Sequence, residues 1–207
     1  MRIIFQKIIL SLAFLGCMPF VLAQNQNSRF ALGVSYGVGS EIKNTDYTYT
    51  NRYVKLPVYY DLKKTKHFEY QIVVAPEVNF ATHQLLNLFF VTPDIPDFEE
   101  KRARFTKLKD IREYVLHVGF LVRKPLSEKW SVYAMGSVGP MITDTETERL
   151  SKGFSFSDVL GLGVSYKTKT FVLDFRPNFR HNSNAGLQSS NSGFNTINYE
   201  FGVVFPL

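Results

Sequence analysis

Apolar and polar residues alternate along most of this chain, from Phe30 to the C-terminus. Over successive short stretches an apolar or aromatic side chain falls at every second position, with small or polar side chains between. Because successive side chains of an extended strand point to opposite faces, a period of two predicts strands rather than helices. We expect eight strands, which contain residues 30–38, 54–62, 68–80, 114–122, 131–142, 154–166, 171–179 and 197–205.

The residues between the apolar positions distinguish two kinds of β protein. Many are charged or strongly polar, and we expect them all on one face: Lys55, Asp61, Glu69, Gln71, Glu77, His117, Arg123, Asp158, Asp174, Arg176, Arg180 and Glu200. A soluble, lipocalin-like barrel would turn this face to water, whereas an outer-membrane barrel encloses it and turns the apolar face to lipid. Inside a narrow barrel these charges must pair, because unpaired buried ions are costly.

The lengths of the connections favour the membrane barrel. Long links and short links alternate along the chain: the long ones are residues 39–52, 83–111, 143–153 and 182–194, and the short ones are 63–66, 125–129 and 167–169. Short periplasmic turns and longer outer loops are typical of outer-membrane barrels. The sequence therefore predicts an all-β fold, an eight-stranded antiparallel transmembrane outer-membrane β-barrel over residues 24–207. A soluble barrel would not explain why all eight strands have an apolar face suited to contact with lipid.

The N-terminal segment has the pattern of an export signal. Arg2 and Lys7 precede an apolar stretch over residues 8–22, which ends in the small residue Ala23 before a polar run. This order predicts a signal peptide over residues 1–23. Lipid attachment at Cys17 is the alternative, but the residues before it make a poor lipobox and apolar residues follow it. We therefore expect an exported protein that resides in the bacterial outer membrane.

Composition and charge narrow the function. The 207 residues are 45% hydrophobic, too apolar for a disordered chain, and no apolar run beyond the N-terminus is long enough for a membrane helix. The single cysteine excludes a disulfide framework and a cysteine metal site, and we expect no cofactor and no metal. Without the two signal-peptide cations, 22 basic and 18 acidic residues leave a net charge of +4. Such a charge on an exported barrel does not indicate a nucleic-acid partner.

A motif near the C-terminus carries the most specific chemistry. It reads His181-Asn-Ser183-Asn184-Ala-Gly186, followed by Asn-Ser-Gly at residues 191–193. The segment resembles the signature of the PagL-type lipid A deacylases, also called acyloxyacyl hydrolases, which is His-x-Ser-Asn-Ala-Gly and then Asn-x-Gly. These are eight-stranded outer-membrane esterases. The resemblance implies a carboxylic ester hydrolase whose substrate is lipid A of lipopolysaccharide.

The alternation places the motif's two reactive side chains on one face. His181 and Ser183 share the odd-numbered positions of the outward apolar residues in the seventh strand, at its outer end. A Ser–His pair beside the outer leaflet suits an esterase that takes an acylated lipid sideways from the membrane. We expect His181 to act as general base and Ser183 as nucleophile, the roles that the resemblance also implies. Backbone amides around Asn184 and Gly186 are the candidate oxyanion hole.

The third member of the expected triad differs from the family pattern. The family has glutamate fourteen residues after the histidine, where this chain has Asn195. Glu200 lies nearby, but alternation turns it inward and leaves Asn195 on the face of His181. We therefore expect Asn195 to accept the His181 N–H, as asparagine does in Cys-His-Asn sites. Because an amide cannot balance an imidazolium charge, slow turnover or an inactive relative remains an alternative, as does a polar cluster that only anchors a loop.

Two other motifs fit structural roles better. Residues 33–37 match G-x-S-x-G, but that nucleophile elbow needs a strand, a turn and a helix, and here Ser35 is expected to face the interior of a strand. The acidic run Asp144-Thr-Glu146-Thr-Glu148 in the third outer loop could bind a divalent cation, although such runs are usually only solvated.

The second outer loop contains cations that could meet lipopolysaccharide. Lys101, Arg102 and Arg104 form a basic cluster, and arginine pairs well with phosphate. The expected function is an outer-membrane serine esterase acting on lipid A, as a monomer or weak homodimer among outer-membrane lipids. The alternative is a non-catalytic barrel that binds lipid or a surface partner through its outer loops. A small pore is a third possibility, against which the charged interior argues.

Overall fold

The computed structural model describes residues 28–42 and 44–207, so the expected signal peptide and Cys17 lie outside the described residues. The strands are β1 (Phe30–Glu41), β2 (Tyr47–Lys55), β3 (Val58–Lys64), β4 (Glu69–Leu85), β5 (Lys109–Pro125), β6 (Trp130–Thr143), β7 (Gly153–Lys167), β8 (Val172–Ser183) and β9 (Phe194–Pro206). Between β4 and β5 lie a short 3-10 helix, η1 (Leu88–Phe90), and α3 (Phe98–Phe105). Neither described helix is long and apolar enough to cross a membrane.

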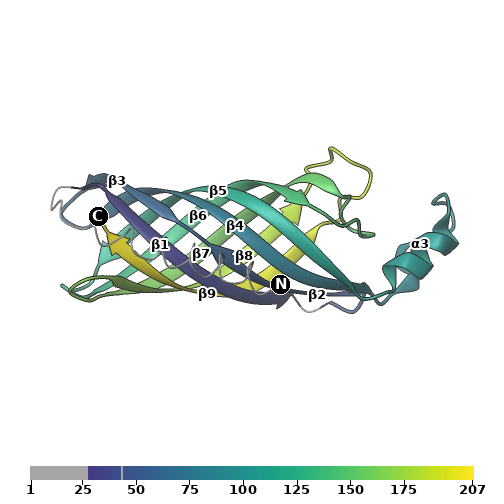
Figure 1. Ribbon diagram of the computed structural model, residues 1–207, viewed down its shortest axis with the longest axis horizontal. Coiled ribbons are helices and arrows are strands. Elements are labelled where there is room, and N and C mark those ends of the chain that lie inside the picture. The colour runs from purple at the N-terminus through teal and green to yellow at the C-terminus, as the bar shows by residue number, and fades with distance from the viewer. Residues whose placement is uncertain (1–27, 43) are drawn as a thin grey trace, which may run out of the picture.

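The strands form one closed antiparallel barrel, which Figure 1 shows from the side. From β3 to β9 each strand pairs with the next in sequence, β1 pairs with both β2 and β3, and β1 also pairs with β9 to close the sheet. The segments β2 and β3 both lie between β1 and β4, so together they make one wall strand that is interrupted at Leu56 and Pro57. Proline cannot donate to a ladder, which accounts for the break. The barrel therefore has eight wall strands, and the predicted fold class is confirmed.

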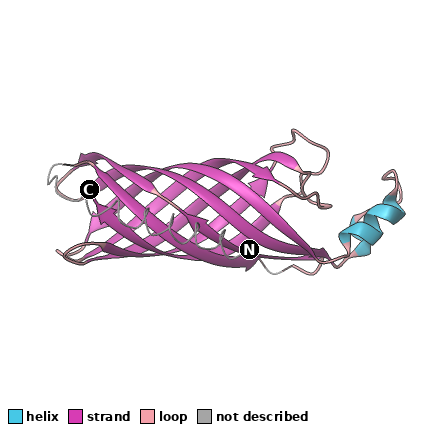
Figure 2. Cartoon of the chain, in the orientation of Figure 1, coloured by secondary structure: helices cyan, strands magenta, loops and turns pink. Residues whose placement is uncertain are grey.

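Short turns and long loops lie at opposite ends of the barrel (Figure 2). Residues 65–68, 126–129 and 168–171 form the short turns, and residues 86–108, 144–152 and 184–193 form the long loops. One expected boundary was wrong: the first outer link spans residues 42–46 instead of 39–52. In this part of β2 the aromatic residues Tyr47 and Tyr49 face the interior, and the outward positions are the polar residues Thr48 and Thr50. The wall thus continues beyond its apolar part.

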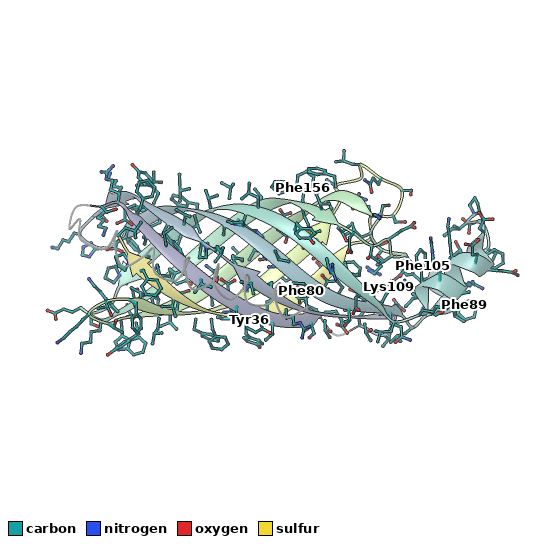
Figure 3. The ribbon with its side chains drawn as sticks, in the orientation of Figure 1. Tyr36, Phe80, Phe89, Phe105, Lys109 and Phe156 are labelled. Atoms are coloured by element: carbon teal, nitrogen blue, oxygen red, sulfur yellow. The ribbon has the colours of Figure 1, made fainter. Side chains whose placement is uncertain are left out.

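The outer wall of the barrel is apolar around its circumference. Large side chains face outward from every part of the sheet, among them Val138, Leu160, Leu162 and Phe201, each more than half exposed. Figure 3 shows side chains projecting from the strands all along the barrel. A protein in water would bury such a surface, whereas a membrane barrel places it against lipid. The soluble, lipocalin-like alternative is therefore excluded.

The interior holds a network of paired charges. Both guanidinium nitrogens of Arg180 donate to Glu77, at 2.7 and 2.8 Å. The Lys55 ammonium lies 3.2 Å from Glu77 and 3.2 Å from Glu200, and Arg176 pairs with Glu200 as well. All five residues are at most 3% exposed. The expected pairing is confirmed, and these side chains occupy the space that a small pore would need.

The G-x-S-x-G segment lies within β1, as predicted. Ser35 is buried inside the barrel and donates to Glu200 at 2.9 Å. A Cβ on Gly37 would fall 2.1 Å from Cζ of Tyr53, so this glycine makes room for the tyrosine ring. The segment serves interior packing and does not form a nucleophile elbow.

Candidate active site

The candidate site lies on the outer wall where β8 and β9 reach the long-loop end. Along β8 the side chains alternate between buried inward residues, such as Arg180 and Asn182, and partly exposed outward ones. His181 and Ser183 are both outward, near the end of the strand. The ladder pairs His181 with Asn195 of β9, which also faces outward.

His181 and Asn195 are in direct contact. Nδ1 of His181 lies 2.7 Å from Oδ1 of Asn195. Because an amide oxygen can only accept, Nδ1 carries the hydrogen in this contact and donates it. The lone pair of Nε2 is then free to take a proton, which is the arrangement that a general-base histidine needs.

Ser183 lies two residues beyond His181 on the same face. Within residues 28–42 and 44–207, no hydrogen bond joins the Ser183 hydroxyl to the His181 ring. Catalytic hydrogen bonds are often long in a free enzyme and shorten when substrate binds. The cross-strand partner of Ser183 is Phe156, whose ring meets Phe154 edge to face at a centroid distance of 5.0 Å. The serine thus lies beside an aromatic patch, near the position labelled Phe156 in Figure 3.

Asp158 is a site residue that the sequence analysis placed wrongly. It was expected inside the barrel, but its side chain is exposed on the outer wall of β7, and its cross-strand partner is His181. The histidine therefore stands between Asn195 on one neighbouring strand and a carboxylate on the other. Alternation could have revealed this, since Asp158 shares the even-numbered positions of the outward residues Phe156 and Leu160.

The loop after β8 is held by its own asparagines. Asn184 is fully buried, and its backbone N–H donates to Oδ1 of Asn191 at 2.7 Å. Its side chain donates to the carbonyl of Ser190 at 2.8 Å and accepts from the N–H of Gly186 at 3.0 Å. Both amides that were expected to form an oxyanion hole therefore already have acceptors within the loop.

Gly193 lies against the histidine ring. Its φ of 65° is in the left-handed region, and a Cβ there would lie 2.4 Å from the carbonyl oxygen of Asn182 and 3.4 Å from Cε1 of His181. Arg149 of the third outer loop holds this glycine in place. The Gly193 N–H donates to the Arg149 carbonyl at 2.9 Å, and Nε of Arg149 donates back to the Gly193 carbonyl at 2.7 Å.

The cations of the second outer loop are partly engaged within the protein. Nε of Arg102 donates to the carbonyl of Val91 at 2.9 Å, and its guanidinium lies over the rings of Phe89 and Phe98. Arg104 forms an ion pair with Glu146 at 2.9 Å. Arg102 thus stabilises the fold of the loop, and Arg104 links it to the third outer loop.

The acidic side chains of the third outer loop go to separate partners. Glu148 contacts Nε2 of His83 at 2.9 Å, Glu146 pairs with Arg104, and Asp144 accepts the backbone N–H of Arg112 at 2.9 Å. In the part of the chain that the structure describes, no group of three or more His, Cys, Asp or Glu side chains is placed to hold a metal ion.

The closed fold and its apolar outer wall define the chain as an eight-stranded outer-membrane β-barrel. Residues 106–204, which include the whole C-terminal motif, match the model of the family described as lipid A 3-O-deacylase (PagL). Over these residues, just under half of the chain, the protein is similar to the PagL-type family, the resemblance that its C-terminal motif indicates. None of the curated protein sequences matches the chain.

Two solved structures are similar to the chain. The outer membrane enzyme PagL superposes with a TM-score of 0.51 at 14% identity, over 84% of this chain and 99% of that one. Neisserial surface protein A superposes with a TM-score of 0.49 at 12% identity, over 87% of this chain and 98% of that one.

Proposed function

We propose that this protein is an outer-membrane serine esterase that hydrolyses an ester-linked acyl chain of lipid A, with its active site at the outer leaflet. The observation that carries the proposal is the 2.7 Å contact between His181 and Asn195, on the lipid-facing wall and two residues from Ser183. The family description, lipid A 3-O-deacylase, supports the substrate class and makes the 3-O acyl chain the first candidate for cleavage.

The proposed reaction begins at Ser183. Nε2 of His181 takes the hydroxyl proton while Oγ forms a bond to the ester carbonyl carbon. The tetrahedral intermediate collapses, the bond from that carbon to the sugar oxygen breaks, and the leaving alkoxide takes the proton from His181. The acyl chain remains on Ser183, and its apolar length rests along the aromatic patch of Phe154 and Phe156.

Water completes the turnover. His181 takes a proton from a water molecule, whose oxygen attacks the acyl carbon and restores a tetrahedral intermediate. When this collapses, the Ser183 oxygen leaves with the proton from His181 and the fatty acid is released. Each residue returns to its starting state, and the reaction uses no cofactor or metal.

Two neighbours of His181 share the task that a triad carboxylate normally performs alone. Asn195 orients the ring through the contact at Nδ1 but carries no charge. Asp158, the cross-strand partner on β7, supplies a negative charge on the other side of the imidazolium. A carboxylate near a developing cation stabilises it most strongly where lipid excludes water.

The developing oxyanion needs donors from the loop after β8. In the proposed transition state the N–H groups of Asn184 and Gly186 turn from their internal acceptors, the side chains of Asn191 and Asn184, to the substrate oxygen. Lys101, with Arg102 and Arg104, would meet the lipid A phosphates. Arg104 must then exchange Glu146 for phosphate.

The proposal is tested by mass spectrometry of lipid A from cells that express the protein. Expression of the wild type should yield lipid A that lacks an acyl chain, and Ser183→Ala should not. Identical acylation in the two strains would overturn the enzymatic function.

A non-catalytic barrel that binds lipid or a surface partner is the second candidate. The observation in its favour is that the amides of Asn184 and Gly186 both donate within the loop, so no oxyanion hole stands ready. This candidate predicts that substitution of the cations at residues 101–109 abolishes function, while Ser183→Ala leaves it intact.

A further inference from the structure

A row of two arginines and a phenylalanine crosses three neighbouring strands on the outer wall. Arg52 of β2 pairs with Phe80 of β4, which pairs with Arg112 of β5. All three side chains are exposed on the lipid-facing side. Around the barrel, β4 is four wall strands away from β8 in either direction. Because Ser183 lies on β8, this row is on the opposite side of the barrel.

The row marks the upper edge of the apolar belt. Outward side chains are apolar over residues 54–62 of β2 and β3 and over residues 114–122 of β5. Each stretch is as long as the roughly 9–11 residues with which a tilted strand crosses a bilayer. Arg52 and Arg112 occupy the next outward positions toward the long loops. They therefore lie where hydrocarbon gives way to lipid headgroups.

The two arginines line one groove. It has a volume of about 520 Å³, and Phe80, Thr50 and Thr82 form part of its wall. The hydroxyls of Thr50 and Thr82 lie 2.8 Å apart above the row. Asp110 also lines the groove, yet among the described residues no ion pair joins either arginine to an acidic side chain. The groove thus presents more positive than negative charge to the headgroup region.

We propose that this groove binds the phosphate-bearing headgroup of a lipid in the surrounding leaflet, as a second lipid site apart from the catalytic one. Arg52 and Arg112 donate charge-assisted hydrogen bonds to phosphate oxygens, for which the planar guanidinium is well suited. The acyl chains of the same lipid lie along the apolar residues below the row. The site does not depend on the proposed esterase activity, because it shares no residue with it.

The test counts bound lipids on the mature barrel in detergent by native mass spectrometry. A Ser183→Ala background prevents consumption of the lipid. The probes are bis-phosphorylated lipid A, the same lipid without phosphates, and inorganic phosphate. The test variant is the double substitution Arg52→Gln and Arg112→Gln. The control is the double substitution Lys63→Gln and Lys124→Gln, which removes the same charge from the other ends of the same wall strands. Heat-dependent electrophoretic mobility verifies that each variant is folded.

The parent protein, which carries Ser183→Ala alone, should bind one more molecule of the phosphorylated lipid A than of the lipid A without phosphates. The arginine double variant should lose that molecule or bind it about tenfold more weakly, as expected for lost charge-assisted contacts, while the lysine double variant retains it. Equal binding by the arginine variant and the parent would overturn the proposal, as would equal binding of the two lipids. Displacement of the lipid by millimolar inorganic phosphate would indicate a free-anion site and would also overturn it.

Discussion

Nδ1 of His181 donates to the amide oxygen of Asn195 at the position where the PagL-type signature has a glutamate. The contact orients the histidine ring as a carboxylate at this position would, but without the negative charge. A histidine whose Nδ1 partner carries no charge is a weaker base in the proposed transition state, and this relationship determines most of what we expect from variants of the site.

Asn195→Glu should increase the rate of ester hydrolysis by about tenfold or more, because loss of the triad carboxylate alone costs a serine protease several orders of magnitude. The rate is measured with purified protein in detergent and with lipid A as substrate. Asn195→Ala is the matched variant and should lower the rate, since it removes the acceptor of the Nδ1 hydrogen. If all three proteins have the same rate, Asn195 does not orient His181.

Asp158→Asn should lower kcat by about tenfold, because it removes a charge beside the imidazolium that forms in the transition state, with little change in KM. Asp110→Asn, another outward aspartate near the loop end, is the control. An unchanged kcat in Asp158→Asn would show that its charge does not act on His181.

Gly193→Ala should abolish most activity and leave the barrel folded. The new Cβ would lie 2.4 Å from the Asn182 carbonyl at a φ of 65°, and the backbone that must move lies against the His181 ring. Gly136→Ala is the control, because a Cβ there meets nothing within 4 Å. Full activity in Gly193→Ala would mean that the loop does not hold the histidine.

Glu77→Leu should destabilise the barrel by about 3–5 kcal/mol, because it leaves Arg180 and Lys55 without a counterion that they contact in the interior. Urea unfolding in lipid vesicles measures the free energy. Glu69→Leu is the comparison: its partner Lys64 is 60% exposed, and such pairs contribute about 0–1 kcal/mol. Similar losses in the two variants would contradict the role of the interior network.

Alternation in the sequence predicts the fold well because each strand is amphipathic over its whole membrane-spanning length. The same alternation places His181, Ser183 and Asn195 on one outward face. Asp158 follows the same rule, because it shares the even-numbered outward positions of Phe156 and Leu160 along β7.

Hydrogen bonding in the loops could not be predicted in the same way. That Asn191 accepts from the Asn184 amide, or that Arg149 holds Gly193, depends on how separate loops fold onto one another. The first outer link was overestimated for a related reason. Above the membrane the wall no longer needs apolar outward residues, so the signal fades before the strand ends.

The most direct test of the account compares lipid A from matched cells that express either the wild type or Ser183→Ala at equal levels in the outer membrane. Mass spectrometry should show a loss equal to one ester-linked acyl chain with the wild type, and fully acylated lipid A with the variant. Fully acylated lipid A in both strains would contradict the proposed esterase activity. Equal deacylation in both would show that Ser183 is not its nucleophile.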